Sequence, residues 1–348
     1  MLNRCIALKK LGIRFLLVYD AYDQLYEQMK ALDLPIVIVN HRLKTVYYLF
    51  PFLNFLLWCQ ITFYMLKLGA KKIHVHHPYL LKNIPPFIPR KSISCHNHMW
   101  FAPGEFTLKA KTSGIRGWLK TVVRRRQYDI RRASKLISVS KSSERFAKEN
   151  FRFKTRTEFL VLLNAVRFNS MKSDCEVEHT NKPCVDVVLI GNISRDKGFF
   201  DVVELVTRTP DLNYRWYGKI DYSTVEKTIL ERLPDNLRLM DYVDDIFPYL
   251  REAEVFLSLS HREAMPNVVL EAATTGLKII TWDIDPMVEM KDLGFDMVTV
   301  KQGSFNLLVK QVRKVHKSTF DPTNNKELCQ NLSQNHQVKK FCEMIGIL

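Results

Sequence analysis

Cysteine is sparse in this chain and follows no spacing pattern. The seven cysteines are scattered and odd in number, and no two of them form a Cys-x-x-Cys pair. This distribution argues against a disulfide framework or a structural zinc site, and it favours a reducing compartment. Arg4, Lys9 and Lys10 interrupt the first apolar stretch, so we expect no secretory signal peptide.

Acidic residues are scarce in the first half of the chain. Residues 1–164 contain 29 Lys and Arg against 9 Asp and Glu, whereas the remainder contains 23 against 27. The formal net charge of +16 therefore comes from the first half. This imbalance predicts that one domain faces an anionic partner, which by charge alone is nucleic acid, anionic lipid or a phosphorylated substrate.

Short apolar segments separated by helical spacers run through both halves, as is typical of parallel α/β sheets. The expected strands are residues 13–19, 36–39, 72–76, 92–95, 135–139 and 160–163, then 185–190, 212–217, 237–240, 255–259, 278–281 and 297–300. We expect two Rossmann-like domains, residues 1–168 and 183–348, joined by the polar linker 169–182. The binding site is expected at the carboxyl ends of the strands, in a cleft between the domains.

Residues 46–66 contain no charged side chain and are long enough to span a bilayer. The alternative is a helix that is buried in the first domain or lies in the membrane interface. Pro51, Asn54 and Gln60 weaken the spanning interpretation. A spanning helix would also separate strands that belong to one sheet, so we expect an interfacial helix.

The strongest chemical signal follows the strand at residues 255–259. Pro266 is well placed to open a helix, whose first backbone N–H groups, at Asn267 and Val268, predict an anion site. Glu263 precedes this helix, and Glu271 lies about one turn into it. Carboxylates around a phosphate site suit a nucleotide sugar, because amides bind the diphosphate while carboxylates bind hydroxyl groups.

Residues 257–280 resemble the Glu-x7-Glu signature of glycosyltransferase family four, whose members have the GT-B fold. Residues 190–198 resemble the diphosphate loop of that family, and residues 239–246 resemble its nucleobase loop. Residues 144–164 resemble the end of its N-terminal domain. The resemblance is strong over residues 185–290 and weaker upstream.

The resemblance implies roles for individual residues. Lys197 would neutralise the leaving diphosphate, Glu263 would contact the donor sugar, and Glu271 would hold the ribose. His96 would lie near the sugar as a third catalytic residue, although a structural role is the alternative and His98 is the second choice. The other donor-binding residues implied are Gly191, Arg195, Pro266, Asn267, Val268, Tyr242 and Val243. The family works without a metal or cofactor, so a UDP-sugar or GDP-sugar would be the donor substrate.

The chain departs from the family pattern at four places, one of which is the interdomain hinge, where residues 164–167 read Asn-Ala-Val-Arg in place of Asn-Gly-Val-Asp. Asn192 replaces an arginine, for which Arg195 is the candidate substitute. Asp285 and Pro286 replace a Gly-Gly pair before Glu289. The resemblance also begins after the first strand and glycine-rich loop of the family, so we expect a GT-B fold whose N-terminal domain lacks its first strand.

Two further clusters attract attention in the first half. His74, His76 and His77 do not predict a metal site, because neighbouring strand residues point to opposite faces and no acidic residue completes a ligand set. The basic run 124–132 lies on a predicted helix. This run is either a solvated helix face or a docking site for anionic lipid or a lipid-linked diphosphate.

Taken together, these features predict a retaining, metal-independent hexosyltransferase. It would move a sugar from a nucleotide sugar to a lipid-linked glycan in cell-surface polysaccharide synthesis, such as lipopolysaccharide synthesis. It would lie in the cytoplasm, at the anionic inner face of the membrane. The alternatives are a non-catalytic nucleotide-sugar-binding protein, or an epimerase or hydrolase with the same fold. Nucleic acid is not expected as a partner, since no known binding module accompanies the charge.

Overall fold

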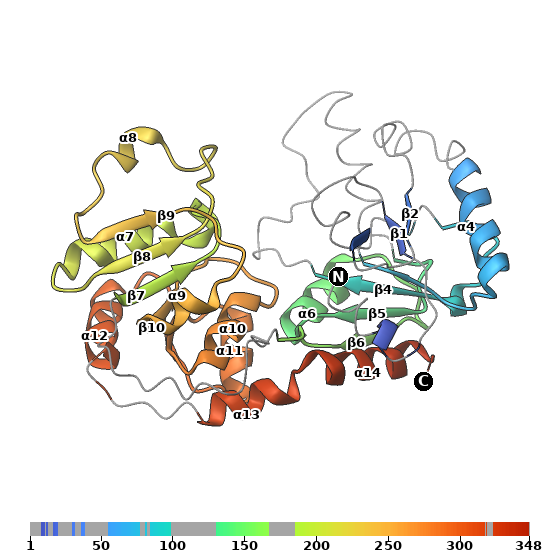
Figure 1. Cartoon of the computed structure of the whole chain (residues 1–348). Coiled ribbons are helices and arrows are strands. Elements are labelled where there is room, and N and C mark those ends of the chain that lie inside the picture. Colours follow the sequence, from blue (N-terminus) through green and yellow to red (C-terminus); the bar gives the residue numbers. More distant parts are fainter. Residues whose placement is uncertain are drawn as a thin grey trace. The chain divides into compact units, whose positions relative to one another are not determined.

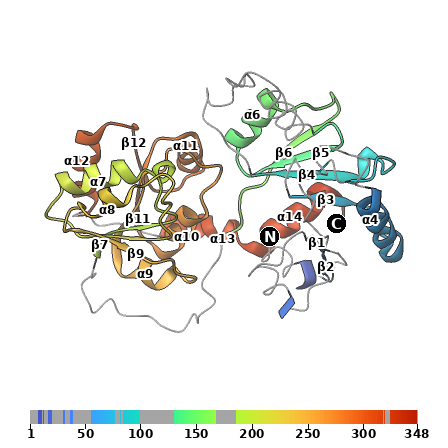
Figure 2. The same ribbon diagram turned by 90° about the horizontal axis from the view of Figure 1, so that it is seen from above.

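The computed structural model describes residues 8–10, 12, 17–19, 30–31, 36–38, 55–76, 81, 84–98, 130–166, 185–316, 318 and 323–347. The chain forms two compact units. Unit 1 comprises Met1–Leu163 together with Gln334–Leu348, and unit 2 comprises Asn164–Ser333. Parallel sheets lie in both units (Figures 1 and 2).

Unit 1 contains a four-stranded parallel sheet and a separate strand pair. The sheet consists, in spatial order, of β3 (Ile73–Val75), β4 (Ile93–Asn97), β5 (Lys135–Ser138) and β6 (Glu158–Val161). The separate pair consists of β1 (Leu17–Tyr19) and β2 (Ile36–Ile38), which are also parallel. The six strands predicted for the first half are thereby confirmed.

Helices cover both faces of the unit 1 sheet. On one face, Ile93 and Leu136 join a core with Ala147 of α6 (Lys141–Asn150). On the other face, Ile137 packs with Phe341 of the last helix, α14 (Gln334–Ile345).

The observed division differs from the predicted domain boundaries. We predicted that residues 334–348 belong to the second domain, but they fold with unit 1. The reason is the apolar stripe of α14, in which Val338, Phe341 and Ile345 recur at helical spacing and pack on Ile137 and Leu162. The units divide at residues 163/164, and the predicted linker 169–182 lies outside the described residues.

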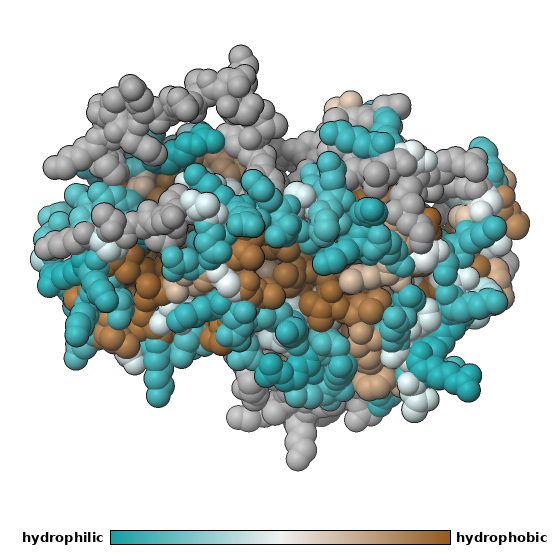
Figure 3. All heavy atoms as spheres, turned by 90° about the horizontal axis from the view of Figure 1, so that it is seen from below, coloured by the Kyte–Doolittle hydropathy of each residue, from teal (hydrophilic) through white to brown (hydrophobic). Residues whose placement is uncertain are grey.

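Helix α4 (Phe55–Leu68) occupies the second part of the uncharged stretch, and residues 46–54 lie outside the described residues. Its Met65 packs against the core, whereas Phe63 and Leu66 are exposed. Figure 3 shows brown apolar side chains reaching the surface between teal polar ones. Within the described part of the chain, no helix has the length and apolar character needed to cross a membrane.

Unit 2 contains a six-stranded parallel sheet in the order β12-β11-β10-β7-β8-β9. Its strands are β7 (Val185–Ile190), β8 (Tyr214–Tyr217), β9 (Leu237–Met240), β10 (Ala253–Ser258), β11 (Lys278–Trp282) and β12 (Val298–Val300). All six were predicted from the sequence. The strand order reverses between the neighbours β7 and β10, which makes this position a topological switch point.

The helices of unit 2 lie on both faces of this sheet (Figures 1 and 2). They are α7 (Phe199–Arg208), α8 (Lys227–Leu230), α9 (Phe247–Arg251), α10 (Asn267–Thr275), α11 (Asp285–Asp292), α12 (Phe305–His316) and α13 (Thr323–Asn331). Helix α7 contacts α12, and α10 contacts α9 and α13. This is the layered arrangement of a Rossmann-like domain.

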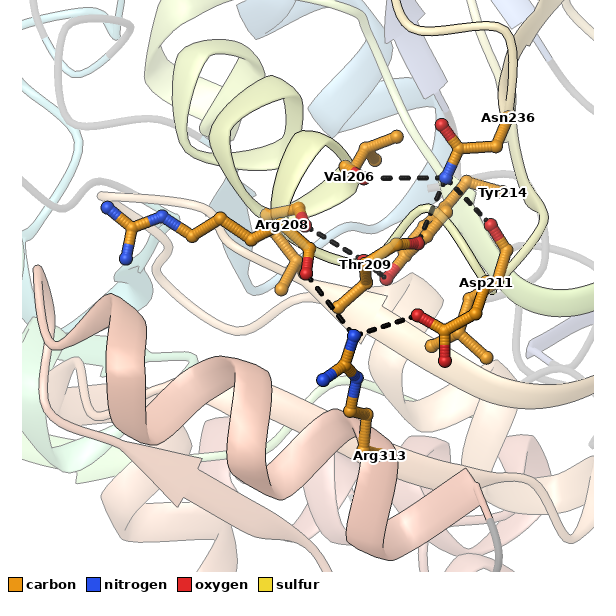
Figure 4. A network of polar contacts seen from close by, with 9 residues as sticks. Val206, Arg208, Thr209, Asp211, Tyr214, Asn236 and Arg313 are labelled. Atoms are coloured by element: carbon orange, nitrogen blue, oxygen red, sulfur yellow. Dashed lines mark hydrogen bonds and ion pairs between the residues drawn. The ribbon is translucent and has the colours of Figure 1, made fainter.

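A polar network fastens the end of α7 to the loop before β9 (Figure 4). The side-chain amide of Asn236 donates hydrogen bonds to the carbonyl oxygens of Val206, Thr209 and Leu212, at 3.4, 3.0 and 2.8 Å. The hydroxyls of Thr209 and Tyr214 lie 2.7 Å apart. Burial raises the pKa of Tyr214 to about 12, so this hydroxyl keeps its proton.

We expect Asn236→Ala to lower the free energy of unfolding by about 1–3 kcal/mol, because three hydrogen bonds from the amide to partly buried carbonyl oxygens are lost. Arg313→Ala is the control. Its guanidinium pairs with Asp211 at 2.8 Å in the same network, but both side chains are about half exposed. Its removal is expected to cost less than about 1 kcal/mol. Urea unfolding curves measure both effects, and equal losses would contradict this account.

Candidate active site

A cavity of about 360 Å³ lies at the carboxyl ends of β7, β8 and β10. It is lined by residues 189–192, 257–260 and 265–268, and by Lys197, Trp216 and Glu263. Its volume falls in the range of small-molecule sites. Open α/β sheets bind ligands at such a switch point.

Close backbone contacts bring the loop after β7 against the neighbouring strands. Gly198 has a φ of +79°, and a Cβ at this position would lie 2.1 Å from the carbonyl oxygen of Leu259. A Cβ at Gly218 would lie 2.0 Å from the carbonyl oxygen of Gly191. The backbone N–H of His261 donates to the carbonyl of Asp196 at 2.9 Å. Glycine is therefore required where the two loops around the cavity meet.

Lys197 and Glu263 form an ion pair in the cavity, with 2.5 Å between Nζ and Oε1. Among the described residues that line the cavity, these two are the charged ones. The Glu263 side chain is only 14% exposed, so little water competes for its carboxylate, whereas the Lys197 side chain is 35% exposed and its ammonium stays accessible from the cavity. The structure thus brings together two of the three predicted catalytic residues.

Asp201, in the first turn of α7, holds the loop that carries Glu263. Its Oδ2 accepts hydrogen bonds from His261 Nε2 and from the indole N–H of Trp282, both at 2.8 Å. Asp201 was not predicted from the sequence, because a single acidic residue near a helix start is a common feature. Its position explains how the loop between β10 and α10 is tied to α7.

Helix α10 begins at Asn267 and ends before Gly276, as predicted. Pro266 precedes it with φ −76° and ψ 114°, and no side chain caps the helix start. The cavity is lined by Pro266, Asn267 and Val268, so the positive end of the helix dipole lies at its wall. This arrangement is suited to binding an anion. The Asn164 amide also donates to the Met265 carbonyl at 2.9 Å.

Four predicted donor-binding residues do not line the cavity: Arg195, Glu271, Tyr242 and Val243. Glu271 is 2% exposed and is not among the lining residues. Arg195 also does not line the cavity, and its guanidinium lies 5.7 Å from the centre of the Phe200 ring. The predicted roles of Glu271 and Arg195 in donor binding stay predictions.

The predicted nucleobase loop follows β9. Tyr242 is exposed there, and the Lys219 ammonium lies 5.0 Å above its ring. Val243 is half-buried in the same loop. Trp216, which the sequence analysis treated only as a strand residue, lines the cavity and donates from its indole N–H to the Gly191 carbonyl at 3.0 Å. Its place at the carboxyl end of β8, beside β7, is the signal that could have identified it.

The sequence also contains an Asp-x-Asp triplet, Asp283 to Asp285, directly after β11. Asp283 accepts a hydrogen bond from the backbone N–H of Gln302 at 2.9 Å, and Asp285 begins α11. Among the described residues, no group of three or more His, Cys, Asp and Glu side chains is arranged to hold a metal ion.

His96 belongs to unit 1 and is completely buried there. Its ring contacts those of His98 and His74, with centroids 4.5 and 5.5 Å away, and lies beside Phe341 of α14. His74 also contacts His76, with centroids 5.4 Å apart, because residues two positions apart share a strand face. The expectation that strand geometry places the histidines on opposite faces therefore does not hold for His74 and His76, which lie two positions apart. The catalytic role of His96 stays a prediction.

The structure describes only the end of the basic run, at residues 130–132, and that end is a turn rather than a helix. Ile130 is completely buried. Arg132 donates to the carbonyl oxygens of Pro85 and Pro86, both at 2.7 Å, and burial lowers the pKa of its guanidinium. Arg132 is therefore a structural residue. Residues 124–129 lie outside the described part of the chain.

A parallel sheet of reversed strand order, with a lysine and an uncapped helix start at its switch point, defines unit 2 as a Rossmann-like unit. Residues 185–318 match the family described as Glycosyl transferases group 1. The alpha-galactosylglucosyldiacylglycerol synthase of Streptococcus pneumoniae (strain ATCC BAA-255 / R6) is 30% identical over 109 residues. That match spans 28% of this chain and 29% of the length of the synthase.

Solved structures match nearly the whole chain at low sequence identity. HepE of Anabaena, crystallised with UDP and glucose, has a TM-score of 0.71 at 14% identity and covers 99% of this chain and 96% of its own. A glycosyltransferase from Rickettsia africae ESF-5 has a TM-score of 0.71 at 15% identity, over 99% and 92%. WaaG, a glycosyltransferase of lipopolysaccharide biosynthesis, has a TM-score of 0.64 at 12% identity, over 99% and 94%.

These comparisons confirm the resemblance to family-four glycosyltransferases that the motifs indicated. The chain has the GT-B fold with two Rossmann-like domains, and its match to the group 1 glycosyltransferases lies within the second unit.

Proposed function

We propose that this protein is a retaining glycosyltransferase that uses a UDP-sugar or a GDP-sugar as donor. The observation that carries this proposal is the cavity in which the ion pair of Lys197 and Glu263 lies beside the uncapped start of α10. The amides of Asn267 and Val268 bind the diphosphate, and Lys197 neutralises it. Glu263 contacts the donor sugar.

The chemistry follows from charge that develops as the glycosidic bond of the donor breaks. Negative charge grows on the leaving diphosphate, and preorganised donors aimed at that charge stabilise the transition state. Lys197 and the start of α10 supply these donors, so the proposed reaction needs no metal or cofactor. In the proposed mechanism, the leaving phosphate helps to activate the acceptor hydroxyl on the same face of the sugar.

We further propose a lipid-linked glycan as acceptor, at the inner face of the membrane and in cell-surface polysaccharide synthesis. Support comes from the similarity to a protein named as a glycolipid synthase, and to WaaG of lipopolysaccharide biosynthesis. The basic first half of the chain also suits an anionic membrane surface.

A thermal-shift panel tests the donor. We expect either UDP and UDP-sugars or GDP and GDP-sugars to raise the melting temperature, since a ligand at 100 times its Kd stabilises by about 2.7 kcal/mol. Sugar transfer to a lipid extract is then measured with the best donor. Binding without transfer or hydrolysis would favour a non-catalytic nucleotide-sugar-binding protein. Turnover without any acceptor would favour an epimerase or hydrolase, and no shift with any nucleotide would overturn the proposal.

A further inference from the structure

Three contacts join the segment that carries Lys197 to the loop that carries Glu263. The first is the ion pair itself, with 2.5 Å between Nζ and Oε1. The other two belong to His261, whose backbone N–H donates to the Asp196 carbonyl at 2.9 Å and whose Nε2 donates to Oδ2 of Asp201 at 2.8 Å. Asp196 and Asp201 lie on either side of Lys197 in the chain. His261, just before Glu263, therefore holds its loop to both sides of the lysine.

Asp201 is the fixed end of this junction. Its Oδ2 also accepts the indole N–H of Trp282 at 2.8 Å, and Trp282 is completely buried in β11. The Asp201 side chain is 19% exposed, whereas the His261 side chain is 33% exposed. A partner from the sheet restricts the rotation of the carboxylate, which in turn fixes the imidazole. The position of the loop after β10 is thus set by the core of unit 2.

His261 and Asp201 do not line the cavity, whereas Lys197 and Glu263 do. The pair can therefore affect a reaction in the cavity only through the residues that it holds in place. A lysine side chain is a flexible four-carbon stem, so the ion pair alone does not fix where its ammonium group lies. The backbone on both sides of the ion pair must also be fixed, and the two bonds of His261 do this.

We propose that His261 and Asp201 form a positioning pair for sugar transfer, which aligns the ammonium group of Lys197 with the carboxylate of Glu263. This inference rests on the proposed function, in which Lys197 meets the leaving diphosphate and Glu263 meets the donor sugar. Misplacement of a reacting group by about 1 Å can lower a rate about 100-fold. Loss of the positioning pair should therefore reduce kcat, although neither residue touches the substrate.

A second histidine–aspartate pair in unit 2 provides a matched control. His316, the last residue of α12, lies 3.0 Å from Oδ1 of Asp186 and 3.3 Å from Oε2 of Glu254. Its side chain is 20% exposed. Asp186 and Glu254 lie near the starts of β7 and β10, at the opposite end of these strands from the cavity. Loss of this pair should change the stability of unit 2 without disturbing the cavity.

Urea unfolding of the full chain tests the alignment and needs no turnover. A double-mutant cycle of Lys197→Met and Glu263→Gln gives the coupling free energy of the ion pair. The cycle is measured in the wild-type, His261→Ala and His316→Ala backgrounds. We expect most of the coupling to be lost with His261→Ala and to be retained with His316→Ala, because only the first change releases the two segments from each other. Equal coupling in all backgrounds would overturn the proposal.

Steady-state kinetics test the effect on transfer. We expect His261→Ala to lower kcat at least about tenfold with little change in KM, and His316→Ala to change neither. His261→Gln, which keeps a side-chain N–H donor, should recover most of the lost rate. In the Lys197→Met background, His261→Ala should cost much less than in the wild type, because the residue that it positions is gone. Equal losses in both backgrounds, or an unchanged kcat in His261→Ala, would contradict the positioning role.

The two measurements separate this inference from the proposed function. A wild-type protein that transfers no sugar would contradict the proposed function, and the unfolding cycle would still decide whether His261 and Asp201 align the ion pair. Transfer by the wild type together with unchanged coupling in His261→Ala would contradict the positioning pair alone.

Discussion

Lys197→Met is expected to lower kcat for sugar transfer at least about 100-fold, the usual cost of removing one preorganised donor from a developing anion. In the structure, the Lys197 ammonium is the cationic group of the cavity and lies 2.5 Å from Glu263. Because this charge acts on the leaving diphosphate as the bond breaks, the loss should fall on kcat more than on KM. Steady-state kinetics with the donor found in the thermal-shift panel measure this loss in kcat.

A second set of variants separates catalysis from folding. Lys197→Met leaves Glu263 as a largely buried carboxylate without its cation, so stability should also fall. Adding Glu263→Gln removes that charge. We expect the double variant to regain the melting temperature but not the activity, and a double-mutant cycle gives the coupling between the two residues. Lys301→Met, at an exposed lysine after β12, controls for loss of one charge. If the double variant recovers sugar transfer, the role of Lys197 is structural and not catalytic.

Much of the fold was predictable because strands and helices of parallel sheets leave strong local patterns. Continuous apolar runs such as residues 185–190 and 255–259 read as buried strands, and β7 and β10 occupy those positions. Proline before and glycine after α10 fixed its ends. The placement of α14 was not predictable, because its apolar stripe shows that it is packed but not which unit it packs on.

The residues of the candidate site were predictable where the ends of strands and helices position them. Contacts between side chains that are distant in the sequence were less predictable. Lys197, Glu263 and the start of α10 line one cavity because they follow neighbouring strands of the sheet. Contacts between residues that are far apart in the chain produce no pattern in the local sequence. Asp201 reaches both His261 and Trp282 across 60 and 81 residues of sequence, and no spacing rule indicates such a junction. His96 was recognised as a strand-end residue, but its burial under α14 depends on the same unpredicted helix.

The basic residues of unit 1 illustrate the same division between charge and position. The sequence showed that the first half is basic, and it pointed to residues 124–132 as the densest run. Only the parallel order of β3 to β6 brings loops as distant as 69–72 and 151–157 to one edge. Arg132, which belongs to that run, is occupied with the carbonyl oxygens of Pro85 and Pro86. Charge density along the chain was therefore a poor guide to the exposed basic surface.

Gly198→Ala is expected to lower stability and remove nucleotide binding, whereas Gly303→Ala should do little beyond a backbone cost. The two glycines have nearly the same φ, +79° and +80°, so both alanines carry the left-handed penalty of about 1–2 kcal/mol. A Cβ at Gly303 meets nothing within 4 Å, but one at Gly198 meets the Leu259 carbonyl oxygen at 2.1 Å. Because that neighbour is backbone of the loop after β10, it cannot rotate away.

The clash should add about 1–3 kcal/mol to the backbone penalty, as overpacking does in cores. It should also separate the loop that carries Lys197 from the loop that carries Glu263, since the two meet beside Gly198 through the bond from His261 N–H to the Asp196 carbonyl. Urea unfolding gives the difference between the two variants, and the thermal shift with nucleotide gives the state of the site. If both variants are equally destabilised and both still bind nucleotide, the two loops do not depend on this contact. The two glycines have nearly the same φ, so the clash at Gly198 is the expected difference between the two variants.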